Sequence, residues 1–117
     1  MSYIDGFLIA VETARRDEII EFSRRMDAMF LEYGATRVVE CWGDDVPDGT
    51  LTDFRRAVQA KDGEEVMFSW IEWPDKATRD AGMAKSTADG RMMAEPMPFD
   101  GKRMIFGGFT PVVVLEK

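Results

Sequence analysis

Four carboxylates, the only cysteine and a tryptophan fall within the ten-residue segment ECWGDDVPDG at positions 40–49. The carboxylates are Glu40, Asp44, Asp45 and Asp48. A calcium loop needs oxygen ligands at fixed spacings, and Asp44, Asp48 and Gly49 match part of that pattern. Two further ligand positions hold Val46 and Arg55 instead. The segment is therefore predicted to be a turn with no metal, and only Glu40 and Trp42 remain candidates for contact with a ligand.

The chain contains no histidine and one cysteine, Cys41. Histidine is the usual general base near neutral pH, the commonest metal ligand and the usual proximal ligand of haem. Its absence argues against Ser-His-Asp and Cys-His catalysis, zinc sites that contain histidine, and haem. We therefore expect no cofactor. Without a histidine to activate it, Cys41 is expected to be a small buried apolar residue.

The net charge is −7, from 22 acidic and 15 basic residues in 117. A negative chain without a long basic run repels a phosphate backbone, so nucleic acid is not an expected partner. No apolar run approaches the ~20 residues that span a bilayer, so no membrane association is expected either. The N-terminus lacks a signal-peptide pattern, and a lone cysteine fits a reducing compartment, so a cytoplasmic location is expected. The length predicts a single domain, 1–117.

Hydrophobic patterning predicts strands at 3–11, 36–42, 65–73 and 104–116. A stripe at helical spacing predicts a helix at 15–33 capped by Gly34. Its members are Ile19, Phe22, Met26, Met29, Phe30 and Tyr33. Residues 51–58 are predicted as a short helix begun by Thr52 or Asp53, although a hairpin is the alternative.

A second long helix is predicted to begin after Pro74 and Asp75 and to pack on the sheet through small residues. These are Ala77, Ala81, Ala84 and Ala88. Residues 89–103 form a long connection, in which Met92 to Phe99 is either a lid over a pocket or a plain surface segment.

The resulting order is β-α-β-β-α-β with a short helix before the third strand. It predicts the α+β class, as a ferredoxin-like plait with a four-stranded antiparallel sheet and two helices on one face. The other face is expected to carry large apolar residues: Phe7, Ile9, Trp42, Phe68 and Trp70. Such a face is unfavourable in water, so two subunits are expected to pair through it as a homodimer.

The strings VVECWGDDVPDG, TDFRRAV, FSWIEWPDKATRDAG and MPFDGKRMIFGGF resemble the bacterial domain-of-unknown-function family 1428. The resemblance covers most of the chain, from Tyr3 to Phe109. It implies the dimeric α/β-barrel superfamily, in which two plaits pair through their open faces, and it implies no activity. Haem-binding members of that superfamily depend on a histidine ligand that this chain lacks.

Strand alternation places Glu40 with Trp42, and Phe68 with Trp70 and Glu72. If Val39, Cys41, Met67 and Ile71 face the helices, both groups share the open face, close to Asp5. Aromatic walls with few polar groups are typical of a ligand pocket. The candidate ligand-binding residues are Asp5, Glu40, Trp42, Arg55, Phe68, Trp70 and Glu72, with Arg55 as a candidate for an anion. Alternatively, the tryptophans form a dimer core, and the acids pair with arginines such as Arg37, Arg55, Arg56 or Arg103.

Three functions remain open. The first is binding of a small organic molecule in the barrel or in the cleft between sheet and helices, without metal or haem. The second is a cofactor-independent enzyme in which Glu40 or Glu72 acts as a general base after burial has raised its pKa. The third is an interaction protein whose open face only forms the dimer. An unpaired carboxylate in a cavity favours the enzyme, and an arginine-bridged one favours the structural role.

Overall fold

The structure, a computed structural model, describes residues 2–117 and belongs to the α+β class. Met1, which the expected domain includes, lies outside the described residues. The strands are β1 (Tyr3–Glu12), β2 (Arg37–Trp42), β3 (Glu64–Trp73) and β4 (Ile105–Phe109), and the helices are α1 (Arg16–Glu32), α2 (Phe54–Ala57) and α3 (Lys76–Ala88). Short 3-10 turns lie at Thr13–Arg15, Gly90–Met93 and Gly101–Arg103.

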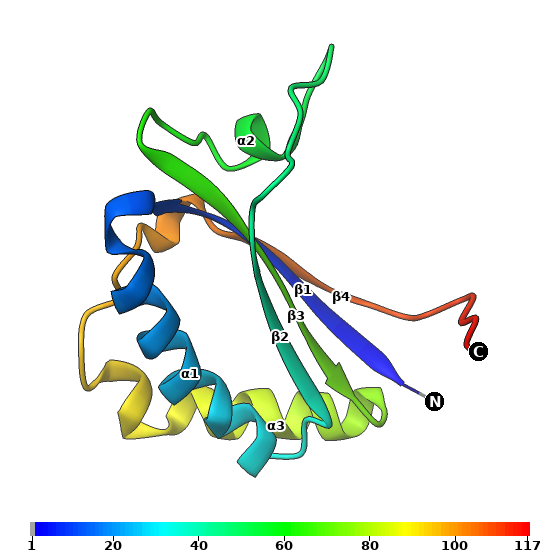
Figure 1. The fold of residues 1–117 in the computed structure, drawn as a ribbon. Helices are drawn as coiled ribbons and strands as arrows, with labels where there is room; N and C mark the ends of the chain where they lie inside the picture. Colours follow the sequence, from blue (N-terminus) through cyan, green and yellow to red (C-terminus); the bar gives the residue numbers. More distant parts are fainter. Residues whose placement is uncertain (1) are drawn as a thin grey trace.

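The four strands form one antiparallel sheet in the order β2-β3-β1-β4. The central pair is the longest, and it runs from Tyr3 opposite Trp73 to Glu12 opposite Glu64. Both long helices lie on the same side of the sheet, and no long helix covers the other side (Figure 1). The expected antiparallel sheet with two helices on one face is thus confirmed.

The predicted stripe explains how α1 packs. Ile19, Phe22 and Met29 are buried against the sheet. Gly34 follows the helix with a φ of 114°, a left-handed conformation that glycine adopts at little cost. The short helix α2 is also confirmed, with Asp53 as its N-cap, because the Asp53 side chain accepts a hydrogen bond from the Arg56 amide.

Helix α3 begins as predicted, with Asp75 as N-cap accepting a hydrogen bond from the Thr78 amide at 2.7 Å. The face that it buries differs from the prediction, however. The four alanines are exposed, and the buried small residues are Gly82 and Ser86. A Cβ at Gly82 would lie 2.5 Å from the Trp73 ring. The helix packs closely because of this glycine.

The last strand is shorter than expected, because β4 ends at Phe109. Within residues 2–117 it pairs with β1 alone, and the pairing stops at Ile4 opposite Phe109, next to the start of β1. Pro111 then lacks the amide hydrogen that a strand needs. The residues from Val112 to Leu115 are exposed and form no strand.

The expected facing of β2 is wrong. Register places Glu40 opposite Ser69 and Trp42 opposite Met67, and Trp42 packs against a core cluster that includes Ile19 of α1. Glu40 and Trp42 therefore face the helices. Cys41 lies instead opposite Phe68 on the open face and is partly exposed, so its expected burial is also wrong.

The same correction applies to β1. Ile9 belongs to the cluster beneath α1, and Phe7 lies on the same side of β1 as Ile9. Of the five apolar residues expected on the open face, only Phe68 and Trp70 are there. The segment after α2 covers one end of this face, where the buried Val58 packs on Ala10 and Val66.

Candidate functional site

A cavity of about 320 Å³ lies between the sheet and the helices α1 and α3. Its walls are mainly phenylalanine and methionine side chains, and the connection after α3 contributes Met92, Met97 and Phe99. That connection therefore forms one wall of the cavity. Glu40 also lines the cavity and is exposed, so the cavity reaches the surface beside β2.

Two carboxyl groups meet at this cavity. Asp27 is half-buried in the middle of α1, and its side chain is hydrogen-bonded to Glu40 of β2. Burial raises the pKa of Asp27 to about 9, and the hydrogen bond to Glu40 and its charge act in the same direction. Asp27 consequently holds its proton near neutral pH.

Ser69 of β3 fixes one member of the pair, because its hydroxyl donates a hydrogen bond to Oε2 of Glu40. This contact follows from the sheet register, in which Ser69 and Glu40 lie directly opposite each other. A carboxylate held by a hydroxyl and a protonated carboxyl beside it can act as acceptor and donor toward one molecule. The geometry suits hydrogen-bond recognition and general acid–base chemistry.

A second polar group lines the cavity from α3. Ser86 is 1% exposed, and its Oγ has no hydrogen-bond partner within residues 2–117. A buried hydroxyl left unsatisfied costs free energy, so a native example requires an explanation. A molecule in the cavity that hydrogen-bonds to this hydroxyl would supply one.

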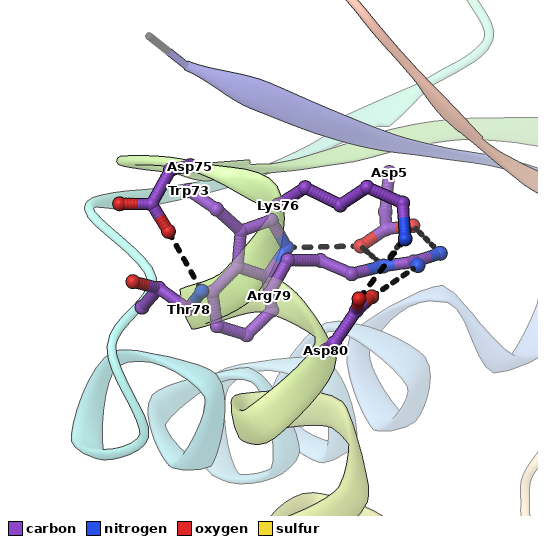
Figure 2. A network of polar contacts seen from close by, with 7 residues as sticks. All are labelled: Asp5, Trp73, Asp75, Lys76, Thr78, Arg79 and Asp80. Atoms are coloured by element: carbon purple, nitrogen blue, oxygen red, sulfur yellow. Dashed lines mark hydrogen bonds and ion pairs between the residues drawn. The ribbon is translucent and has the colours of Figure 1, made fainter.

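Asp5, in contrast, belongs to a saturated structural network at the start of α3 (Figure 2). Its carboxylate accepts hydrogen bonds from Trp73 Nε1 at 2.9 Å and from Arg79 Nη2 at 2.8 Å. Arg79 also donates to Asp80 at 3.0 Å, and its guanidinium lies 5.1 Å from the ring centroid of Tyr3. The hydrogen bonds to Asp5 raise the pKa of Arg79. Asp5 is thus an internal ion-pair partner.

Phe68, Trp70 and Glu72 lie together on the open face. The Phe68 and Trp70 rings pack edge to face with centroids 5.8 Å apart. Glu72 accepts a hydrogen bond from Trp70 Nε1 at 2.8 Å and a longer one from Arg37 at 3.4 Å. This acid is bridged by an arginine of the same chain, which is the arrangement that favours a structural role.

The two remaining candidates are also engaged within the chain. The Arg16 guanidinium lies 5.4 Å from the ring centroid of Trp42. Arg55 donates to the Glu64 carbonyl at 2.8 Å and to Glu65 at 3.3 Å. The seven candidates thus occupy three regions: Glu40 at the cavity, Asp5 and Trp42 in packed positions on the helix side, and the rest on or beside the open face.

The acidic segment 43–53 contains no helix or strand. Asp53 accepts hydrogen bonds from the amides of Gly49 at 3.0 Å and Arg56 at 2.7 Å, which lower the pKa of Asp53. No group of three or more acids and cysteines suited to a metal ion occurs within residues 2–117. The described chain likewise has no helix that could cross a membrane.

Asp27, Ser69 and Ser86 are not among the site residues that the sequence predicts. Asp27 had a detectable signal, because it interrupts the apolar stripe of α1 between Met26 and Phe30. A carboxylate within the buried face of a helix is uncommon. The two serines gave no such signal, since buried serines are common.

The fold and the cavity define a small α+β protein with one antiparallel sheet and an acid-lined apolar pocket. The model of the family described as "Protein of unknown function (DUF1428)" matches residues 2–101, and the chain belongs to this family. It is 52% identical over 115 residues to the uncharacterized protein YbaA of Escherichia coli K12, and equally to YbaA of E. coli O157:H7 and of Shigella flexneri. Each alignment covers 97% of this chain and 98% of the relative.

Proposed function

We propose that the protein binds a small organic molecule in the cavity between the sheet and the two long helices. The observation that carries this proposal is the placement of the Asp27–Glu40 pair at the mouth of an apolar cavity. Ligand sites typically combine apolar walls with a few polar groups and have volumes of about 300–1,000 Å³. Neither a metal nor haem is part of this proposal.

The protein is further proposed to act as a homodimer. The strand order fits a ferredoxin-like plait, and the family resemblance implies that two such plaits pair through their open faces into an α/β barrel. The open face supports this, because Phe68 is 45% exposed, Ile105 44% and Phe109 60%. Contiguous apolar surface of this kind is typical of an interface. In that assembly the cavity remains on the helix side of each subunit.

A second candidate function is cofactor-independent acid–base catalysis in the same cavity. The raised pKa of Asp27 beside Glu40 favours it, because a donor and an acceptor lie side by side. Glu40 would accept a proton from a carbon next to a carbonyl group, while Asp27 donates a hydrogen bond to the carbonyl oxygen. The product would be an enol or a tautomer, which needs no oxidant or reductant.

Native mass spectrometry of the protein purified from its own host tests the binding proposal. A dimer that carries a reproducible additional mass is expected. In Thr87→Phe, a large ring enters the cavity from an exposed lining position of α3, and the additional mass should be lost. The matched control is Ala84→Phe, on the exposed side of the same helix, which should keep it.

An additional mass that persists in Thr87→Phe would place the ligand elsewhere, and a chain that is empty in every preparation would count against the proposal. A monomer would contradict the proposed assembly while leaving the cavity untouched. The catalytic candidate requires that Glu40→Gln retain ligand but lose proton exchange at the bound molecule.

A further inference from the structure

The charged groups of the cavity all have one sign. The titratable side chains among its lining residues are Asp27 from α1 and Glu40 from β2, and no lysine or arginine is among them. Helix α3, β1, β3, β4 and the connection after α3 contribute apolar, serine or threonine side chains. An anionic ligand would therefore be repelled, and the remaining choices are a neutral molecule and a cation.

Neither carboxyl group has a cation partner in the described part of the chain. The ion pairs of residues 2–117 include neither Asp27 nor Glu40, although thirteen other pairs form. Two adjacent carboxyl groups without a cation retain a proton, because both cannot ionise at low cost. An ammonium group placed between them would replace that proton and compensate both charges.

The walls suit the apolar body of such a cation. Phe22 and Phe30 of α1 line the cavity together with Phe7 of β1. The faces of aromatic rings attract cations, and methionine side chains adapt to ligands of different shape. The exposed position of Glu40 at the mouth also lets a charged group remain near water while an apolar body enters the cavity.

A buried hydroxyl supplies independent evidence for a ligand. Ser86 lines the same cavity from α3, is 1% exposed, and has no partner for its Oγ within the described chain. A ligand with a second polar group, separated from its cationic end by an apolar body, would satisfy it.

We propose that this cavity binds an organic amine, with its ammonium group between Asp27 and Glu40, its aromatic or aliphatic body against the phenylalanine and methionine walls, and a second polar group at Ser86. This inference rests on the proposed binding function and specifies the chemical class of the ligand. Binding of the ammonium group also displaces the proton that Asp27 holds.

Isothermal titration calorimetry with three probes of similar shape tests the charge requirement. The probes are phenethylamine, phenethyl alcohol and phenylacetate, used at about pH 7 where an alkylamine, with a pKa near ~10, is cationic. The amine is expected to bind about tenfold more tightly than the alcohol, a difference of ~1.4 kcal/mol, and phenylacetate is expected not to bind. Titration in two buffers of different ionisation enthalpy should show release of up to about one proton with the amine and none with the alcohol.

Asp27→Asn and Glu40→Gln should each remove the preference for the amine, and Asp27→Asn should also remove the proton release. Glu72→Gln is the matched control, because Glu72 is an acid on the open face that does not line the cavity. It should leave both quantities unchanged. Circular dichroism of each variant establishes that it is folded.

Equal or tighter binding of the alcohol would overturn the amine inference while supporting the binding proposal. If none of the three probes bound to the folded protein, both would fail. Tight binding of phenylacetate would contradict the inference from charge directly.

Tyramine tests the role of Ser86, since it adds a hydroxyl group at the far end of phenethylamine. Tyramine is expected to bind more tightly to the wild type, by about fivefold for one hydrogen bond. In Ser86→Ala the two amines should bind equally. The same gain in Ser86→Ala as in the wild type would remove Ser86 from the site and leave the acid pair unaffected.

Discussion

Asp5 and Asp27 are two carboxyl groups on the helix-covered side of the sheet, and their surroundings are opposite. Asp5 is 3% exposed and is surrounded by donors, namely the Trp73 indole and the Arg79 guanidinium. Asp27 is more exposed, yet its neighbour is a second acid, Glu40. Burial alone therefore does not distinguish a structural acid from one available for a ligand. The chemistry of the nearest partner does.

The largest effect on stability is expected from removing the cation that compensates the buried Asp5 carboxylate. Arg79→Met removes the cation and leaves the Asp5 carboxylate buried without charge compensation. The free energy of unfolding should fall by about 3–5 kcal/mol, as measured by urea denaturation. Arg24→Met, which breaks the exposed pair with Glu21, is the control and should change it by less than about 1 kcal/mol. A similarly small decrease in Arg79→Met would mean that the buried Asp5 carboxylate does not need the Arg79 cation for stability.

The second largest effect on stability is expected at Gly82, where α3 packs closely on Trp73 of the Asp5 network. In Gly82→Ala the new Cβ would lie 2.5 Å from the Trp73 ring and 2.7 Å from the Tyr33 carbonyl oxygen. Overpacking should lower the free energy of unfolding by about 1–3 kcal/mol, although alanine is the better helix former. Gly90→Ala, where a Cβ meets nothing within 4 Å, should be close to neutral. A stabilised Gly82→Ala would show that α3 can move away from the sheet.

Replacing Asp27, the acid that lies beside Glu40, should change the free energy of unfolding in the opposite direction. Asp27 has a raised pKa, so the folded chain holds a proton that the unfolded chain releases above 3.8. Stability from this group is therefore lost progressively as the pH rises from 3.8 to about 9. Asp27→Asn should increase the free energy of unfolding by about 1–2 kcal/mol at pH 7–8, a value reduced for the partial exposure of Asp27.

The same variant should flatten the dependence of stability on pH between pH 4 and 9, followed by thermal unfolding in a buffer series. Glu21→Gln, an exposed acid on the same helix, serves as the control and should keep the wild-type slope. A destabilised Asp27→Asn at pH 8 would contradict a protonated Asp27 in the folded chain.

The smallest effect on stability is expected at a third acid, Glu72, which has partners but is less buried than Asp5. Glu72 is partly exposed and accepts from Trp70 and Arg37. Glu72→Gln should lower the melting temperature slightly, corresponding to less than about 1 kcal/mol. An increase in the melting temperature would indicate that the Glu72 carboxylate destabilises the open face despite its contact with Arg37.

Most of the fold could be predicted because periodicity in the sequence reports local structure directly. The stripe of α1, the caps Gly34 and Asp53, and the start of α3 after Pro74 all follow from such patterns. The facing of β2 could not be predicted in the same way. Its sequence RVVECW places apolar residues on both sides, so alternation defines two faces without choosing between them. The register with β3 makes that choice, and register is a tertiary property.

The candidate site was predictable only in part for the same reason. The sequence indicates Glu40 as a carboxylate that could contact a ligand, but the predicted face of β2 is opposite to the one that Glu40 occupies. Its partner Asp27 lies on a helix thirteen residues earlier, and no local pattern links the two positions. The buried face of α3 differs from the predicted one because Gly82 and Ser86 have a helical spacing like that of the alanines, so spacing alone does not show which set is buried.

A cysteine on the open face makes this surface accessible to chemical labelling. Cys41 is the single cysteine of the chain, lies opposite Phe68 and is partly exposed. A maleimide dye would therefore mark this one surface stoichiometrically, without any engineered thiol. The rate of labelling should fall as protein concentration increases if the face becomes covered by a second subunit, and should be independent of concentration otherwise. The natural sequence thus carries its own kinetic reporter of association, on the opposite face of the sheet from the acid pair.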